Sequence, residues 1–69
     1  MNYKYIGTNN YKYRYFKSPL GFLKVLLYTF IDTATGFTNI GEYNISSDST
    51  DDQIESFVKS QIERIENMQ

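Results

Sequence analysis

The segment Phe22-Leu-Lys-Val-Leu-Leu-Tyr-Thr-Phe-Ile31 carries the clearest structural signal in the chain. Alternate residues in a strand fall on opposite faces, and here large apolar side chains occupy both faces. A strand that is apolar on both faces is covered on both sides, which is typical of a central strand. A helix is the competing interpretation, but Thr29 together with the breaks at Gly21 and Gly36 favours a strand.

The segment that follows predicts a strand that pairs back on the central one. Residues 37–45 come after a short polar connection, as in a hairpin. Uninterrupted alternation would place Phe37, Gly41 and Tyr43 on one face of this strand. We therefore expect residues 22–31 and 37–45 to be antiparallel neighbours.

The segment before the central strand predicts a second hairpin. Residues 2–6 and 11–17 alternate around the Gly/Asn-rich cluster at 7–10, which suits a turn because Gly and Asn tolerate positive φ. Pro19 ends this hairpin, since proline cannot donate to a sheet ladder. The expected sheet is an antiparallel β-meander of three to four strands.

The last part of the chain has the period of an amphipathic helix. Ser49 or Thr50 can cap its start, with Asp52 or Gln53 three residues on as the reciprocal partner. The helix should span residues 50–66. Its apolar stripe consists of Ile54, Phe57, Val58, Ile62 and Ile65. The expected fold is thus α+β: one small domain over the whole chain, with the C-terminal helix packed on one face of the sheet.

One helix can cover only one face of such a sheet. A helix of about 17 residues is ~25 Å long and ~10 Å wide. We expect it to lie on the aliphatic face of residues 22–31, although the aromatic face is the alternative. The other face is then covered by the first hairpin, covered by a partner, or left as an exposed patch. The expected core consists of Leu23, Val25, Leu27, Ile31, Ile40, Ile54, Phe57, Val58, Ile62 and Ile65.

Length and composition limit what the protein does. The chain has 69 residues, and a single core of this size rarely supplies more than about 3–5 kcal/mol of net stability. It has no Cys and no His, which excludes disulfides and thiolate metal sites and removes the commonest general base. Self-association is the remaining way to add stability, so a homodimer is expected. Residues 1–8 lack the apolar region of a signal peptide, and no apolar run is long enough to span a bilayer, so a cytoplasmic location is expected.

The sequence offers no catalytic constellation. The glycines are scattered and form no phosphate-binding loop. The acids Asp48, Asp51, Asp52 and Glu55 do not follow the spacing of a calcium loop and suit the start of a helix instead. We therefore expect no enzyme activity, no cofactor, no metal and no small-molecule substrate.

Charge and aromatic residues divide unevenly along the chain. Residues 1–25 carry five cations and no acid, whereas residues 26–69 carry all eight acids against two cations, which gives +5 and −6. The cationic part is also rich in tyrosine. A cationic aromatic surface suits an anionic partner or a protein interface. The candidate interaction surface consists of Tyr11, Lys12, Tyr13, Arg14, Tyr15, Lys17, Tyr28 and Phe30.

The function expected from these observations is a non-catalytic protein-interaction module, which either associates with itself or binds another protein. The alternative is a nucleic-acid-binding accessory protein that uses the basic, Tyr-rich hairpin. A minor possibility is mimicry of nucleic acid by acids on the helix, although Lys59 interrupts that face. The composition is similar to that of small proteins of AT-rich Gram-positive bacteria and their phages, and this resemblance implies a phage or prophage accessory protein.

Overall fold

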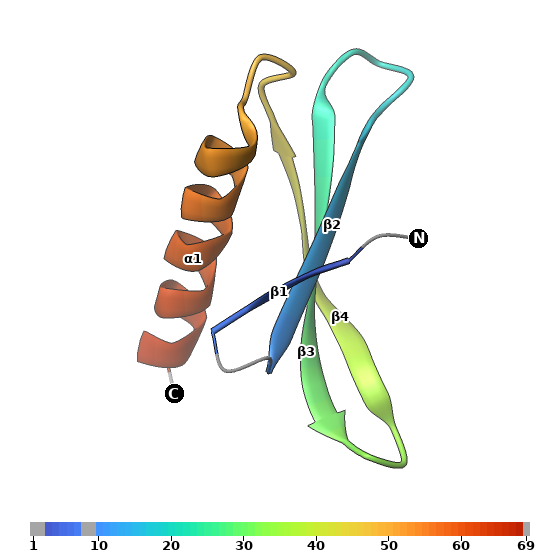
Figure 1. The fold of residues 1–69 in the computed structure, drawn as a ribbon, viewed down its shortest axis with the longest axis vertical. Coiled ribbons are helices and arrows are strands. Elements are labelled where there is room, and N and C mark those ends of the chain that lie inside the picture. The colour runs from blue at the N-terminus through green and yellow to red at the C-terminus, as the bar shows by residue number, and fades with distance from the viewer. Residues whose placement is uncertain (1–2, 8–9, 69) are drawn as a thin grey trace.

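The computed structural model describes residues 3–7 and 10–68, and these form one antiparallel sheet and one helix (Figure 1). The strands follow the order β1-β2-β3-β4 in the sheet, so strands that are adjacent in the sheet are also consecutive in the sequence. The α+β meander with a C-terminal helix is confirmed. The elements are β1 Lys4–Ile6, β2 Tyr11–Lys17, β3 Leu23–Asp32, β4 Gly36–Ile45 and α1 Asp51–Asn67.

The observed strands lie close to the predicted ranges. β2 matches residues 11–17, β3 ends one residue later than predicted, and β4 begins one residue earlier. Residue 2 of the predicted first strand and residues 8–9 of the predicted turn lie outside the described residues.

The start of α1 has the predicted capping box. The Gln53 backbone N–H donates to Thr50 Oγ1 at 3.2 Å, and the Thr50 backbone N–H donates to Gln53 Oε1 at 2.9 Å. Asp51 and Asp52 occupy the first turn, where acids favour the helix dipole. Local sequence alone therefore sets where the helix begins.

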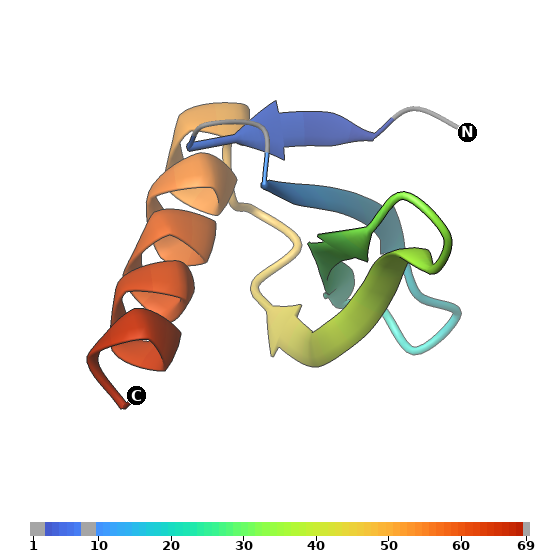
Figure 2. The same cartoon turned by 90° about the horizontal axis from the view of Figure 1, so that it is seen from below.

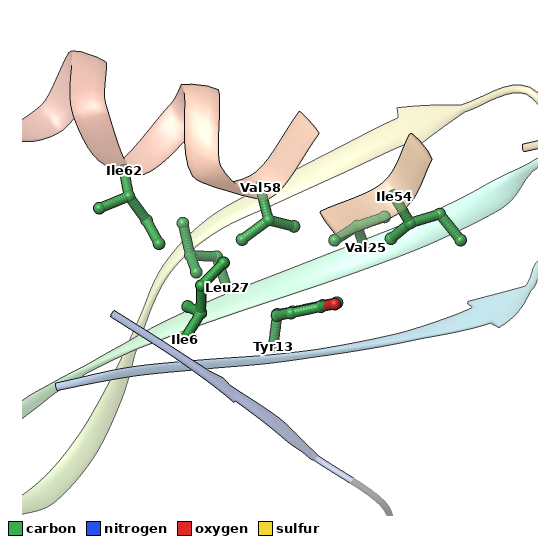
Figure 3. Packing of buried hydrophobic residues seen from close by; sticks show 7 residues of the cluster. All are labelled: Ile6, Tyr13, Val25, Leu27, Ile54, Val58 and Ile62. Carbon is green, nitrogen blue, oxygen red and sulfur yellow. The ribbon is translucent and has the colours of Figure 1, made fainter. Parts of the chain in front are cut away.

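The helix covers one face of the sheet and leaves the opposite face uncovered by any helix (Figures 1 and 2). Ile54, Val58 and Ile62 point from α1 toward the sheet (Figure 3). They meet Val25 and Leu27 of β3, so the prediction that α1 packs on the aliphatic face of this strand is confirmed. We call the sheet face away from α1 the outer face.

An extra residue in β4 reverses the direction of its side chains. Leu27 and Tyr28 are consecutive in β3, but their partners in β4 are Gly41 and Asn39, so Ile40 is left as the extra residue of a bulge. Directly opposed residues share a face. Before the bulge, β4 therefore presents its odd-numbered residue Phe37 to the outer face, whereas after the bulge the odd-numbered residues Gly41 and Tyr43 lie on the helix face. The prediction of uninterrupted alternation through residues 37–45 is wrong for this reason.

The core differs from the predicted one at both ends of the sheet. Ile31 was expected to be buried but is 50% exposed, because Phe30 pairs with Phe37 and Asp32 with Gly36, leaving Ile31 as an extra residue. The buried cluster is completed by two unpredicted residues, Ile6 and Tyr13. The remaining predicted core residues are partly buried and pack against the cluster: Leu23, Ile40, Phe57 and Ile65.

Candidate interaction surface

The tyrosines of β2 face the helix and belong to the core side of the sheet. Tyr13 is 1% exposed and lies opposite Leu27 in the β2–β3 ladder. On either side of it, the Tyr11 hydroxyl donates to Glu66 at 3.2 Å and the Tyr15 hydroxyl donates to Asp51. These two bonds tie β2 to the C-terminal and N-terminal turns of α1. The tyrosine row is thus a structural element that positions the helix.

Protonation of these hydroxyls is favoured in the folded state. Burial raises the pKa of Tyr13, and the nearby carboxylates of Glu55 and Asp51 raise it further. Burial also raises the pKa of Tyr11, whereas the hydrogen bond to Asp51 is the main cause of the raised pKa of Tyr15. In all three cases the neutral phenol is the form that the fold accommodates.

The outer face carries an aromatic cluster centred on the Lys12 ammonium. Lys12 Nζ lies 4.0 Å from the ring centroid of Tyr3, 4.4 Å from that of Phe37 and 5.9 Å from that of Tyr28. The Tyr3 and Tyr28 rings meet edge to face with centroids 5.5 Å apart. Phe30 packs on Phe37 at the same distance and in the same geometry. The cluster joins residues from the N-terminal segment, β2, β3 and β4.

Arg14 lies next to Lys12 on the outer face. Its guanidinium sits over the Phe16 ring at 5.3 Å from the centroid. Its Nε atom is buried and has no hydrogen-bond partner. Leu26, which lies opposite Arg14 in the ladder, is buried on this face. The third cation of the outer face, Lys24, has an ion-pair partner, because its Nζ lies 4.0 Å from a Glu42 carboxylate oxygen.

Several rings of the outer face are open to solvent. Tyr5 is 58% exposed, Phe30 40% and Phe16 39%. In the described part of the chain no helix lies against this face of the sheet (Figure 2). Tyr5 and Phe30 both pack on Phe37, and a group of exposed apolar side chains like this on a protein surface marks an interaction site.

The structure divides the eight predicted site residues between the two faces. Lys12, Arg14, Tyr28 and Phe30 share the outer face through their ladder partners. Tyr11, Tyr13 and Tyr15 lie on the helix face, and Lys17 is exposed at the end of β2. Sequence reasoning missed the outer-face rings Tyr3, Tyr5, Phe16 and Phe37. The observation that would have found them is the pairing of residues across strands, because Tyr5 lies opposite Lys12 and Phe30 lies opposite Phe37.

Other parts of the surface offer little chemistry. Two shallow hollows flank α1, one lined by Ile45, Ser46, Asp48, Ser49, Gln53 and Phe57, the other by Ile6, Gly7, Lys59, Ile62, Glu63 and Glu66. Within residues 3–7 and 10–68 no group of three or more Asp, Glu, His or Cys side chains is placed to hold a metal ion. In the same part of the chain, no helix has the length and apolar character needed to cross a membrane.

Comparison with protein-family models, with curated proteins and with solved structures finds no match to this chain. The function must therefore be inferred from the surface itself. The architecture alone would not settle it, because one fold hosts many functions.

Proposed function

We propose that this protein is a non-catalytic interaction module whose outer face binds another protein. The observation that carries the proposal is the set of exposed rings on the sheet face that α1 leaves open, among them Tyr5, Phe16 and Phe30. Aromatic and Arg side chains are enriched in the centres of protein interfaces, where they supply most of the binding energy. Here both residue types occur together on one side of the sheet.

The arrangement of the rings favours a protein over a single-stranded nucleic acid. Bases stack on open, flat ring faces. Lys12 instead lies over the rings of Tyr3 and Phe37, and Arg14 lies over the ring of Phe16. The ring pairs of the cluster meet edge to face. Nucleic acid is the second candidate, because the outer face also carries cations that could meet phosphates.

Loss of the exposed rings tests the proposal. The tagged protein is used to recover partners from cells that express it, in parallel with the double variant Tyr5→Ser, Phe30→Ser. The matched control is Leu20→Ser, because Leu20 is a highly exposed apolar residue in the turn before β3. We expect the double variant to lose its partner by about tenfold or more, the effect of removing one or two interface anchors. Equal recovery with the double variant and the control would contradict the proposal.

We also propose that a second copy can pair along β4, which would give the expected homodimer. β4 is an edge strand of ten residues with Glu42 as its single charge and no proline. Natural edges are usually protected by Lys, Pro, short length or a cover, and β4 has only the bulge at Ile40. Sedimentation velocity at micromolar protein should show a dimer that Thr38→Lys dissociates and the helix control Ser60→Lys does not. A monomer throughout the concentration range would refute the pairing.

A further inference from the structure

We infer that the segment bound by the outer face is acidic, and that its carboxylates meet Arg14 and Lys12. This inference rests on the proposed function and specifies the chemistry of the partner. It depends on three observations: an unpaired donor, two cations without acids, and the distribution of charge between the faces.

The unpaired donor belongs to Arg14. Its Nε is buried without a hydrogen-bond partner, which is uncommon because leaving a buried donor unsatisfied is costly. A guanidinium presents its N–H groups as a planar fork that matches a carboxylate in bidentate geometry. Stacking on the Phe16 ring holds the guanidinium in place. Arg14 is thus held in position. Its buried Nε is shielded from an incoming group, whereas the two Nη groups are not among the buried unpartnered atoms and are the ones that would meet a carboxylate end-on.

Lys12 and Arg14 differ in their partners from three other cations of the chain. Lys4, Lys24 and Lys59 each lie within 4.0 Å of a carboxylate oxygen. Within the described part of the chain, Lys12 and Arg14 have no such carboxylate and contact aromatic rings instead. A cation held against rings keeps its charge available to an incoming anion.

The outer face carries net positive charge, whereas the rest of the chain is acidic. On the outer face three cations, Lys12, Arg14 and Lys24, stand against the single acid Glu42, which is a net charge of +2. The whole chain is −1, so the remainder is −3. Five of the eight acids lie in the helix: Asp51, Asp52, Glu55, Glu63 and Glu66. Complementary charge guides binding and suppresses like-charged partners.

These charges also argue against a second copy on the outer face. Two outer faces in contact would bring Arg14 and Lys12 close to the same cations of the other copy, which repel. The exposed face of α1 has the required acids, but its exposed residues between Asp51 and Asn67 are polar or charged and offer nothing apolar to cover the rings. The occupant that fits is a segment of another protein that places acidic side chains beside apolar ones.

Selection from a displayed library of random twelve-residue peptides tests this inference. The purified full chain is the target at physiological salt. We expect enriched peptides to carry Asp or Glu next to aromatic or aliphatic residues. Arg14→Gln should weaken their binding by about tenfold or more, whereas the control Arg64→Gln, at an exposed position of α1, should leave it unchanged. Arg14→Lys should recover only part of the affinity, because an ammonium lacks the bidentate fork. Thermal unfolding of each variant confirms that it folds.

The outcomes separate the inference from the proposed function. Peptides that need Tyr5 and Phe30 but are insensitive to Arg14→Gln would overturn the inference and leave the proposed function standing. Peptides that depend on none of these residues would overturn both. The single-stranded DNA oligo(dT) tests whether the outer face binds phosphate instead of carboxylate. Micromolar, salt-sensitive binding of oligo(dT) that requires Arg14 would show that the bound anion is phosphate and would also overturn the inference.

Discussion

The substitutions Ile54→Val and Ile31→Val each remove one methylene group. The free energies of unfolding of these two variants distinguish the observed core from the one that the sequence predicts. Both residues were expected to be buried, but Ile54 is 1% exposed and Ile31 is 50% exposed. Ile→Val removes about 0.8 kcal/mol of transfer free energy when the methylene is fully buried. Incomplete collapse around Ile54 adds a cavity term, so we expect Ile54→Val to lower the free energy of unfolding by about 1 kcal/mol.

The expected loss for Ile31→Val is less than about 0.5 kcal/mol, because half of this side chain already contacts water. Urea unfolding followed by far-UV circular dichroism measures both values, with the denaturant slope expected to stay constant. A loss of 1 kcal/mol corresponds to about 4–8 °C in Tm for a domain of this size. Equal losses at the two positions would refute the assignment of Ile31 to the surface.

Valine is a better probe than alanine here. Truncating a buried Ile to Ala costs about 2–5 kcal/mol, which is comparable with the ~3–5 kcal/mol that a core of this size supplies. Ile54→Ala should therefore be largely unfolded, and no difference between folded variants could be measured.

Three further predictions concern the tyrosines. Tyr13→Ala should unfold the chain, since truncating a buried aromatic costs about 3–5 kcal/mol, whereas Tyr5→Ala should keep a native circular dichroism spectrum. Tyr15→Phe removes the hydrogen bond to Asp51 and should lower the free energy of unfolding by about 0.5–1 kcal/mol in urea titrations; no change would show that this bond does not hold the helix. The pKa values of Tyr11, Tyr13 and Tyr15 are raised above 10.0 in the fold, so their contribution to stability is complete below pH 10 and is lost as the pH rises through the folded values. Unfolding free energies measured from pH 8 to pH 11 should be flat at first and then fall, and a constant value to pH 11 would contradict this expectation.

The elements of the fold that local chemistry determines were predictable from sequence. Thr50 and Gln53 form a capping box within four residues, and the apolar stripe of α1 has a clear helical period. The bulges at Ile31 and Ile40 were not predicted. Gly41 directly follows Ile40 and is a recognised signal of a bulge inside a strand, but it does not say which residue is the extra one. An extra residue moves every following side chain to the other face of the sheet. The predicted faces were therefore wrong at the end of β3 and in half of β4.

The candidate surface was predicted only in part, for a related reason. Either face of β2, the one with the tyrosines or the one with Lys12 and Arg14, could have been the exposed one, because tyrosine is intermediate in burial and also favours strands. Only the pairing of Tyr13 with Leu27 shows that the tyrosine row faces the helix. The ring of Tyr3 reaches Lys12 from the segment before β1, and the ring of Phe37 reaches it from β4, so both contacts depend on the register between strands.

Photocrosslinking tests the central claim most directly. A photoreactive benzoylphenylalanine is placed at Phe30 on the outer face or at Ser60 on the exposed face of α1, and cells that produce each variant are irradiated. If the outer face binds another protein, the probe at position 30 should give a discrete crosslinked protein species that the probe at position 60 does not give. Crosslinks to nucleic acid at position 30, or the same protein crosslinks at both positions, would contradict the account.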